Sequence, residues 1–137
     1  MLVTAVVLLV TYWSVWFTDR SWLASEHTAA YYAFEDAFPL ADGLLAVACV
    51  LALVALHRRS PTALLWLLAG GGAGLYLCGL DLLYDLEHAI FTRGAGGAIE
   101  AVIVAVEMVF SVVLLRWSWR HRAELLAGDS SGVRTGT

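Results

Sequence analysis

The chain has 137 residues, of which 61% are hydrophobic and 15% are charged. Soluble proteins contain roughly 45–50% apolar and about 25% charged residues, and a domain of this size buries only about two-thirds of the surface that its unfolded chain exposes. The composition therefore excludes a soluble enzyme and indicates an integral membrane protein. The net charge of −4 provides no basic surface for nucleic acid, so we expect no nucleic-acid partner.

Four apolar runs follow one another along the chain. A helix needs about 20 residues to cross roughly 30 Å of hydrocarbon, with a usable range near 17–25. The first run has no Lys or Arg before it and no small-x-small site after it, so we interpret it as a span rather than a signal peptide. The sequence predicts an all-α, four-helix transmembrane bundle over residues 1–126. The runs are 2–17, 40–56, 63–83 and 98–117.

Arginine supplies all eight basic residues, and its placement predicts the orientation. A pair at 58–59 lies between the second and third runs, and Arg116, Arg120 and Arg122 lie at the end of the fourth. By the positive-inside rule both segments should be cytoplasmic, which puts both termini inside. The tail, residues 127–137, should be disordered. The arginine-only composition favours a multi-pass protein of a bacterial inner membrane.

The first outer loop contains a further helical pattern. Ser25 can cap a helix that runs to Phe38, in which Tyr31, Phe34 and Phe38 share one face. Such an aromatic stripe suits the headgroup region of a bilayer, so we expect a short interfacial helix here. Pro39 then either starts the second span or kinks a continuous helix.

The third run carries small residues on one helical face, at Gly70, Gly74 and Cys78. Small residues let helices approach closely in lipid. We interpret these three as a helix-packing face, used either inside the bundle, in a homodimer or against a larger membrane partner. The glycine-rich segment is not a phosphate loop, because no Gly-Lys-Ser/Thr follows it.

Three of the predicted spans carry acidic side chains towards the outer end of the bundle. Spacing of i, i+4 and i+7 puts Asp81, Asp85 and His88 on one face of the third span. A carboxylate that faces lipid at mid-bilayer costs roughly 3 kcal/mol or more, so the acidic side chains should point into the bundle. The predicted outward-facing pocket consists of Asp42, Asp81, Asp85, His88, Glu100 and Glu107.

We expect this pocket to bind a cation, because like charges so close together require compensation. Carboxylates with one imidazole suit Mn²⁺, Fe or Zn²⁺, and oxygens alone favour Ca²⁺ or Mg²⁺, so a divalent metal ion is a candidate cofactor at the six residues. The groups could instead carry protons or bind a polar headgroup. An embedded enzyme would perform acid–base or metal-assisted chemistry on a lipid-phase substrate, with Asp81, Glu107 and His88 as candidate catalytic residues.

Two other functions fit the same sequence. A non-catalytic accessory subunit would dock on a larger membrane partner through the face of Gly70 and Gly74. A cation or proton transporter would use the acidic groups directly, although four spans leave little room for alternating access without a dimer. Asp85 and Glu100 also have a plainer explanation, as a solvated helix end and as an acid favoured at a helix N-terminus.

Overall fold

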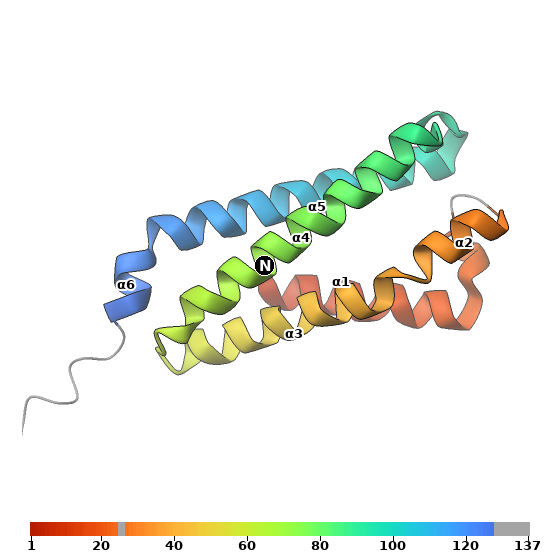
Figure 1. Ribbon diagram of the computed structural model, residues 1–137. Helices are drawn as coiled ribbons and strands as arrows, with labels where there is room; N and C mark the ends of the chain where they lie inside the picture. The colour runs from red at the N-terminus through yellow and green to blue at the C-terminus, as the bar shows by residue number, and fades with distance from the viewer. Residues whose placement is uncertain (25–26, 128–137) are drawn as a thin grey trace, which may run out of the picture.

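The computed structural model describes residues 1–24 and 27–127, and every regular element in these ranges is a helix, as the sequence predicts (Figure 1). Four of the helices, α1, α3, α4 and α5, are long and apolar enough to cross a membrane, which is the architecture of a multi-pass membrane protein. The elements are α1 (Leu2–Asp19), η1 (Arg20–Trp22), α2 (Ala29–Glu35), α3 (Phe38–His57), α4 (Thr62–Glu87), η2 (Ile90–Thr92), α5 (Gly94–Arg120) and α6 (Arg122–Ala127).

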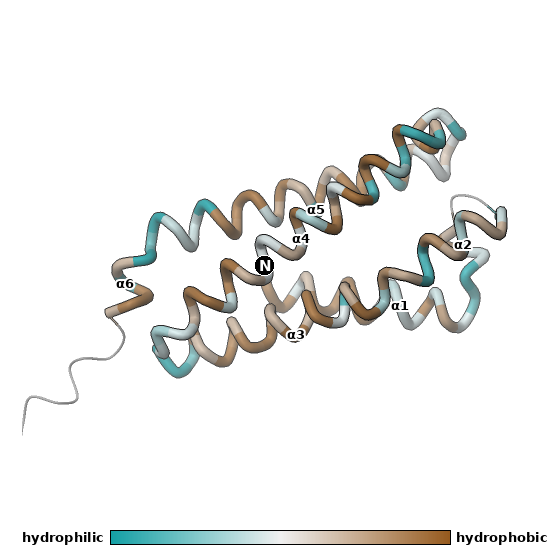
Figure 2. The backbone as a smooth tube through the Cα atoms, in the orientation of Figure 1, coloured by the Kyte–Doolittle hydropathy of each residue, from teal (hydrophilic) through white to brown (hydrophobic). Residues whose placement is uncertain are grey.

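The lengths of the four long helices match a bilayer. At about 1.5 Å per residue, the 18 residues of α1 and the 26 residues of α4 extend far enough to cross roughly 30 Å of hydrocarbon. Figure 2 shows hydrophobic residues along the middle of the helices and hydrophilic residues near both ends of the bundle. We call the end that holds α2 and the α4–α5 connection the α2 end.

The four long helices pack in the order α1, α3, α4, α5. Close contacts join α1 to α3, α3 to α4 and α4 to α5, whereas α1 and α5 do not form a closely packed pair in the described part of the chain. Helices α1 and α5 are therefore the two ends of a row, and the gap between them is not closed by direct helix packing.

The small residues of α4 are buried inside this row. Gly70 lies against Ala48 of α3, and a Cβ atom on Gly74 would meet Ser111 Oγ of α5. Cys78 is fully buried, and its Sγ donates to a backbone carbonyl of α5 over 3.3 Å. The face that contains Gly70, Gly74 and Cys78 is thus covered by α3 and α5 of the same chain, and is not exposed to a partner.

A tight connection joins α4 to α5. Ala89 has a φ of 52° and Gly94 a φ of 68°, so the chain reverses within a few residues. Gly97 leaves no room for a side chain, because a Cβ atom there would meet the carbonyl oxygen of Ile90, which is itself fully buried. This packing fixes the start of α5 against the end of α4.

The helix expected between the first two spans is shorter than predicted. Ser25 lies outside the described residues, and Thr28 is the cap of α2, with its Oγ1 accepting a 3.2 Å hydrogen bond from the Tyr31 amide. The helix ends at Glu35, and Pro39 lies in the first turn of α3. Because proline has no N–H to bond the Glu35 carbonyl, the two helices are not continuous.

The aromatic stripe of α2 also faces a different way from the one predicted. Tyr31 is 1% exposed and Phe38 is 7% exposed, so both point into the bundle rather than towards lipid headgroups. Phe34 packs on Phe38 with ring centroids 4.8 Å apart. The stripe therefore docks α2 onto α3 and α4. The predicted tail, 127–137, is described only at Ala127, which ends α6; the rest of it lies outside the described residues.

Candidate functional site

The bundle contains a cavity of about 600 Å³ between α1 and α5. Its walls come from α1, α3, α4 and α5 together with the end of α2, and most of the side chains that line it are apolar. No arginine or histidine is among the described residues in its lining. The acidic residues that line it are Glu35, Asp42, Asp81, Glu100 and Glu107.

The cavity opens sideways, between α1 and α5. Leu8 of α1 and Val102 and Val106 of α5 all line it, yet these side chains are 58%, 62% and 55% exposed. They form an apolar rim on the outer surface of the bundle. In a membrane, an exposed apolar surface of this kind faces the hydrocarbon of the lipids.

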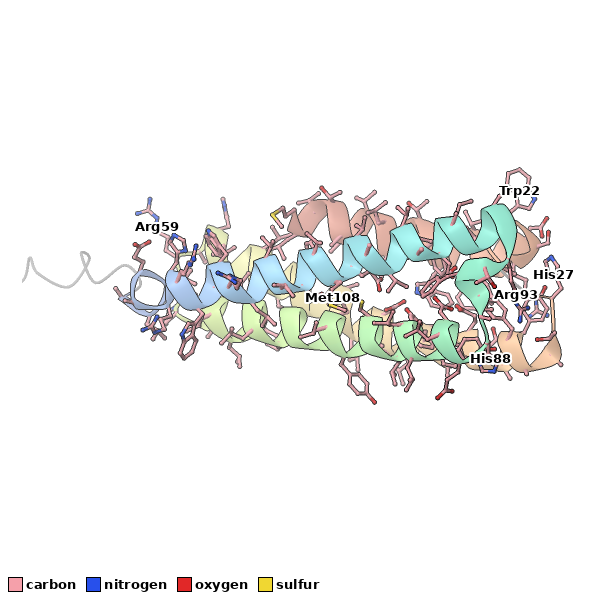
Figure 3. All side chains as sticks on the ribbon, turned by 90° about the horizontal axis from the view of Figure 1, so that it is seen from above. Trp22, His27, Arg59, His88, Arg93 and Met108 are labelled. Atoms are coloured by element: carbon pink, nitrogen blue, oxygen red, sulfur yellow. The ribbon has the colours of Figure 1, made fainter. Side chains whose placement is uncertain are left out.

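The acidic residues lie at more than one depth. Asp81 precedes the last residue of α4 by six positions and Glu100 follows the first residue of α5 by six positions, so the two share a level about 9 Å from the helix ends. Glu107 lies about 10 Å deeper along α5. Figure 3 places its neighbour Met108 roughly half-way along the molecule.

Two of the acidic groups accept hydrogen bonds from aromatic side chains. Asp42 of α3 accepts a 2.8 Å hydrogen bond from Trp13 Nε1 of α1. Glu35, which is 8% exposed, accepts hydrogen bonds from Tyr31 and, over 3.4 Å, from the Tyr12 hydroxyl. These bonds connect α1 to α3 and α2 along the wall of the cavity.

Two other acidic groups, Glu107 and Asp81, accept no such hydrogen bond. Glu107 Oε2 is buried and has no hydrogen-bond partner among the described residues. Asp81 of α4 lines the cavity, and its side chain forms no hydrogen bond or ion pair with another side chain in residues 1–24 and 27–127. An unsatisfied buried polar group costs about 1–3 kcal/mol. The unpartnered oxygen of Glu107 therefore lowers the free energy of unfolding of the isolated chain.

Asp85 and His88 lie outside the cavity, although the sequence grouped them with it. Asp85 is 3% exposed, and its Oδ2 has no partner among the described residues. His88 follows the last residue of α4, is exposed, and lies near Arg93 at the α2 end (Figure 3). His88 is the C-cap of α4, and its amide still donates to the Tyr84 carbonyl oxygen over 3.0 Å, but its side chain does not line the cavity.

A stack of aromatic rings accounts for the position of His88. Its ring stacks on Tyr84 with centroids 4.0 Å apart, and Tyr84 stacks on Phe34 of α2 at 3.9 Å. His88 Nδ1 lies 2.9 Å from the Tyr84 carbonyl oxygen. The imidazole thus belongs to the contact between α2 and α4.

The structure does not bring all six residues predicted as metal ligands to one cavity. Among residues 1–24 and 27–127, no three His, Cys, Asp or Glu side chains are grouped so that they could hold a metal ion. The imidazole is outside the cavity, and the acidic groups are spread along its depth. The lining can offer acid–base groups or negative charge to a ligand that is larger than an ion.

The cavity also includes residues that the sequence did not assign to it. Tyr12 and Trp13 of α1 both line the cavity. Glu35 was not included in the predicted pocket. The available signal was its spacing from Tyr31, since residues i and i+4 share a helical face, and both side chains are buried.

Arg20, at the end of the bundle where α2 lies, is engaged outside the cavity. Arg20 forms an ion pair with Asp36 over 3.7 Å and lies 4.2 Å from the centre of the Tyr32 ring. Asp36 also accepts a 3.2 Å hydrogen bond from Trp16 Nε1. Arg20 lines a separate, open hollow at the α2 end and does not neutralise the cavity.

A comparison with known proteins found no match: no family model, no curated protein and no solved structure resembles this chain. The fold and the site define its class, a multi-pass helical membrane protein with a laterally open acidic cavity. Its function is argued from the chemistry of that cavity.

Proposed function

We propose that this protein binds an amphiphilic molecule of the lipid phase in the cavity between α1 and α5. The molecule enters sideways from the membrane, its apolar part lies against the rim, and its polar part meets the acidic side chains. The observation that carries this proposal is the combination, in the lining of one cavity, of an exposed apolar rim with acidic groups from α2, α3, α4 and α5.

The size and lining of the cavity support this proposal. Ligand sites in proteins typically occupy about 300–1,000 Å³ and combine apolar walls with a few polar groups, and this cavity has both properties. Retaining Glu107 with an unpartnered buried oxygen lowers the stability of the isolated chain. A bound polar group that contacts Glu107 would remove that penalty.

The proposal extends to location and to chemistry. We place the protein in a bacterial inner membrane, with both termini in the cytoplasm and the α2 end outside, because five of the seven described arginines lie towards the opposite end. If it acts on its ligand, Asp81 and Glu107 are the acid–base groups. His88 is not proposed for that role, since it lies outside the cavity. An accessory role through Gly70 and Gly74 receives no support from their packing inside the bundle.

Photolabelling tests the proposed binding. The probe is a long-chain alcohol with a diazirine on its alkyl chain, added to the protein in nanodiscs, and the labelled residues are mapped by peptide mass spectrometry. We expect labels on the cavity-facing residues of α1 and α5, and their loss in Val106→Trp, which fills the rim. Val109→Trp is the matched control, because Val109 is equally exposed on α5 but does not line the cavity. Even labelling of all exposed helix surfaces, unchanged by Val106→Trp, would overturn the proposal.

A further inference from the structure

We infer that the polar group bound in this cavity is an ammonium group, primary or methylated, held by Glu107 and Asp81 on an alkyl-bearing molecule. This inference rests on the proposed function and names the chemical class of its ligand. It stands on the partners of each acidic group, on the aromatic walls and on the direction in which the cavity opens.

The acidic groups of the cavity differ in whether they have a hydrogen-bond partner within the protein. Asp42 is bonded to Trp13, and Glu35 is bonded to Tyr12 and Tyr31. These two groups are hydrogen-bonded within the protein, and Glu100 also has an interaction with the chain. The remaining pair in the lining is Asp81 and Glu107, of which Glu107 keeps a buried oxygen without a hydrogen-bond partner among the described residues.

A fitting partner for these two groups in their ionised form is a hydrogen-bond donor that carries a positive charge. Carboxylates only accept hydrogen bonds, and no arginine or histidine is among the described residues of the lining. A compact metal ion needs several ligands converging on one point, and no such group exists among residues 1–24 and 27–127. An ammonium group needs only one or two carboxylates and fits a cavity with otherwise apolar walls.

The aromatic lining favours an ammonium group as well. Tyr12 and Trp13 both line the cavity, with ring centroids 5.2 Å apart and their planes nearly perpendicular. Phe110 of α5 contributes a further ring. Aromatic faces attract organic cations, and methylated ammonium groups are recognised by cages of aromatic rings. The rim of Leu8, Val102 and Val106 suits an attached alkyl chain.

Two photoprobes of the same chain length test this inference, one with a hydroxyl and one with an ammonium head. The nanodiscs contain diglucosyldiacylglycerol, which has neither charge nor amine and so cannot compete. We expect the ammonium probe to label the cavity at about tenfold lower concentration, the factor that about 1.4 kcal/mol of charge-assisted contact provides. Glu107→Gln should bring the two probes to within about twofold of each other. Glu87→Gln removes an exposed acid at the end of α4 and should leave the preference unchanged.

The outcomes separate this inference from the proposed function. Equal cavity labelling by the two probes, or a preference that survives Glu107→Gln, overturns the ammonium assignment and leaves the binding of amphiphiles intact. Failure of both probes to label the cavity overturns the proposed function itself. If Glu107→Gln does not yield folded protein by size-exclusion chromatography, Asp81→Asn provides the same comparison.

A competition experiment distinguishes the two sources of an ammonium group. Phosphatidylethanolamine added to the nanodiscs should displace the ammonium probe if the natural ligand is a membrane lipid. Dodecylamine should displace it in the absence of that phospholipid if the ligand is a simple alkylamine. Displacement by either supports the ammonium assignment, and displacement by neither, with dodecanol equally ineffective, contradicts it.

Discussion

The indole Nε1 of Trp13 donates a 2.8 Å hydrogen bond to Asp42 Oδ2 and so connects α1 to α3 at the cavity wall. Similar contacts recur along α1, which is the least buried of the four long helices. Helices in lipid gain little from apolar burial against one another, so polar contacts and close packing hold them together. The contacts are Tyr12 with Glu35, Trp13 with Asp42 and Trp16 with Asp36.

Trp13→Phe should weaken the attachment of α1. The variant removes the indole donor and leaves the Asp42 carboxyl group without that bond, which should lower the free energy of unfolding by about 1–2 kcal/mol. The measurement is unfolding in mixed detergent micelles followed by circular dichroism. Trp22→Phe is the control, because Trp22 is 83% exposed. Equal effects of the two variants would show that the bond to Asp42 does not stabilise the bundle.

Gly97→Ala should destabilise the connection between α4 and α5. The new Cβ atom would meet the carbonyl oxygen of Ile90, a backbone atom that cannot move aside as a side chain can. We expect a loss of about 1–3 kcal/mol in the same unfolding assay. Gly72→Ala meets nothing within 4 Å and should be neutral or stabilising by roughly 0.5–1 kcal/mol. An unaffected Gly97→Ala would mean that the turn relaxes freely.

The four spans were predictable because their signal is local. Each apolar run is long enough to cross the hydrocarbon, and a backbone in lipid must satisfy its hydrogen bonds internally, which leaves helices as the solution for such runs. The structure accordingly places the four long helices over the four predicted runs. The division between α2 and α3 also has a local cause, the missing N–H of Pro39.

The composition of the cavity was only partly predictable because it depends on tertiary contacts. Asp42, Asp81, Glu100 and Glu107 follow from burial of acids inside the bundle, and the structure does bring these four to one cavity. His88 does not line the cavity, because its ring stacks on Tyr84, which in turn stacks on Phe34 of α2. No periodicity in the sequence predicts that stack, because it depends on the position of α2.

Thr28→Ala should loosen α2 and with it the cavity wall. The variant removes the hydrogen bond from the Tyr31 amide to the cap, which typically costs about 1 kcal/mol of helix stability. We expect faster hydrogen–deuterium exchange across Ala29–Glu35 and weaker photolabelling of the cavity, since α2 carries Glu35 into it. Thr28→Ser keeps the hydroxyl and should behave like the unmodified protein. Fast exchange in both variants would assign the effect to lost packing of the threonine methyl group.

Cysteine labelling tests the proposed orientation. Trp22 and Arg59 lie at opposite ends of the molecule and are both exposed (Figure 3). With the α2 end outside, a membrane-impermeant maleimide should label Trp22→Cys in intact spheroplasts of a bacterial host and label Arg59→Cys only after permeabilisation. The two native cysteines, Cys49 and Cys78, are 1% and 0% exposed and should give no background.

The opposite labelling pattern would reverse the topology without changing the fold. The unmodified protein, treated in parallel, shows that any signal comes from the introduced thiol. The result also fixes which leaflet supplies the ligand, because Asp81 and Glu100 lie about 9 Å from the α2 end of their helices and Glu107 lies near mid-length. Labelling of Trp22→Cys from outside would assign the headgroup of the bound molecule to the outer half of the bilayer. An ammonium-bearing probe added externally should then reach the cavity without crossing the membrane.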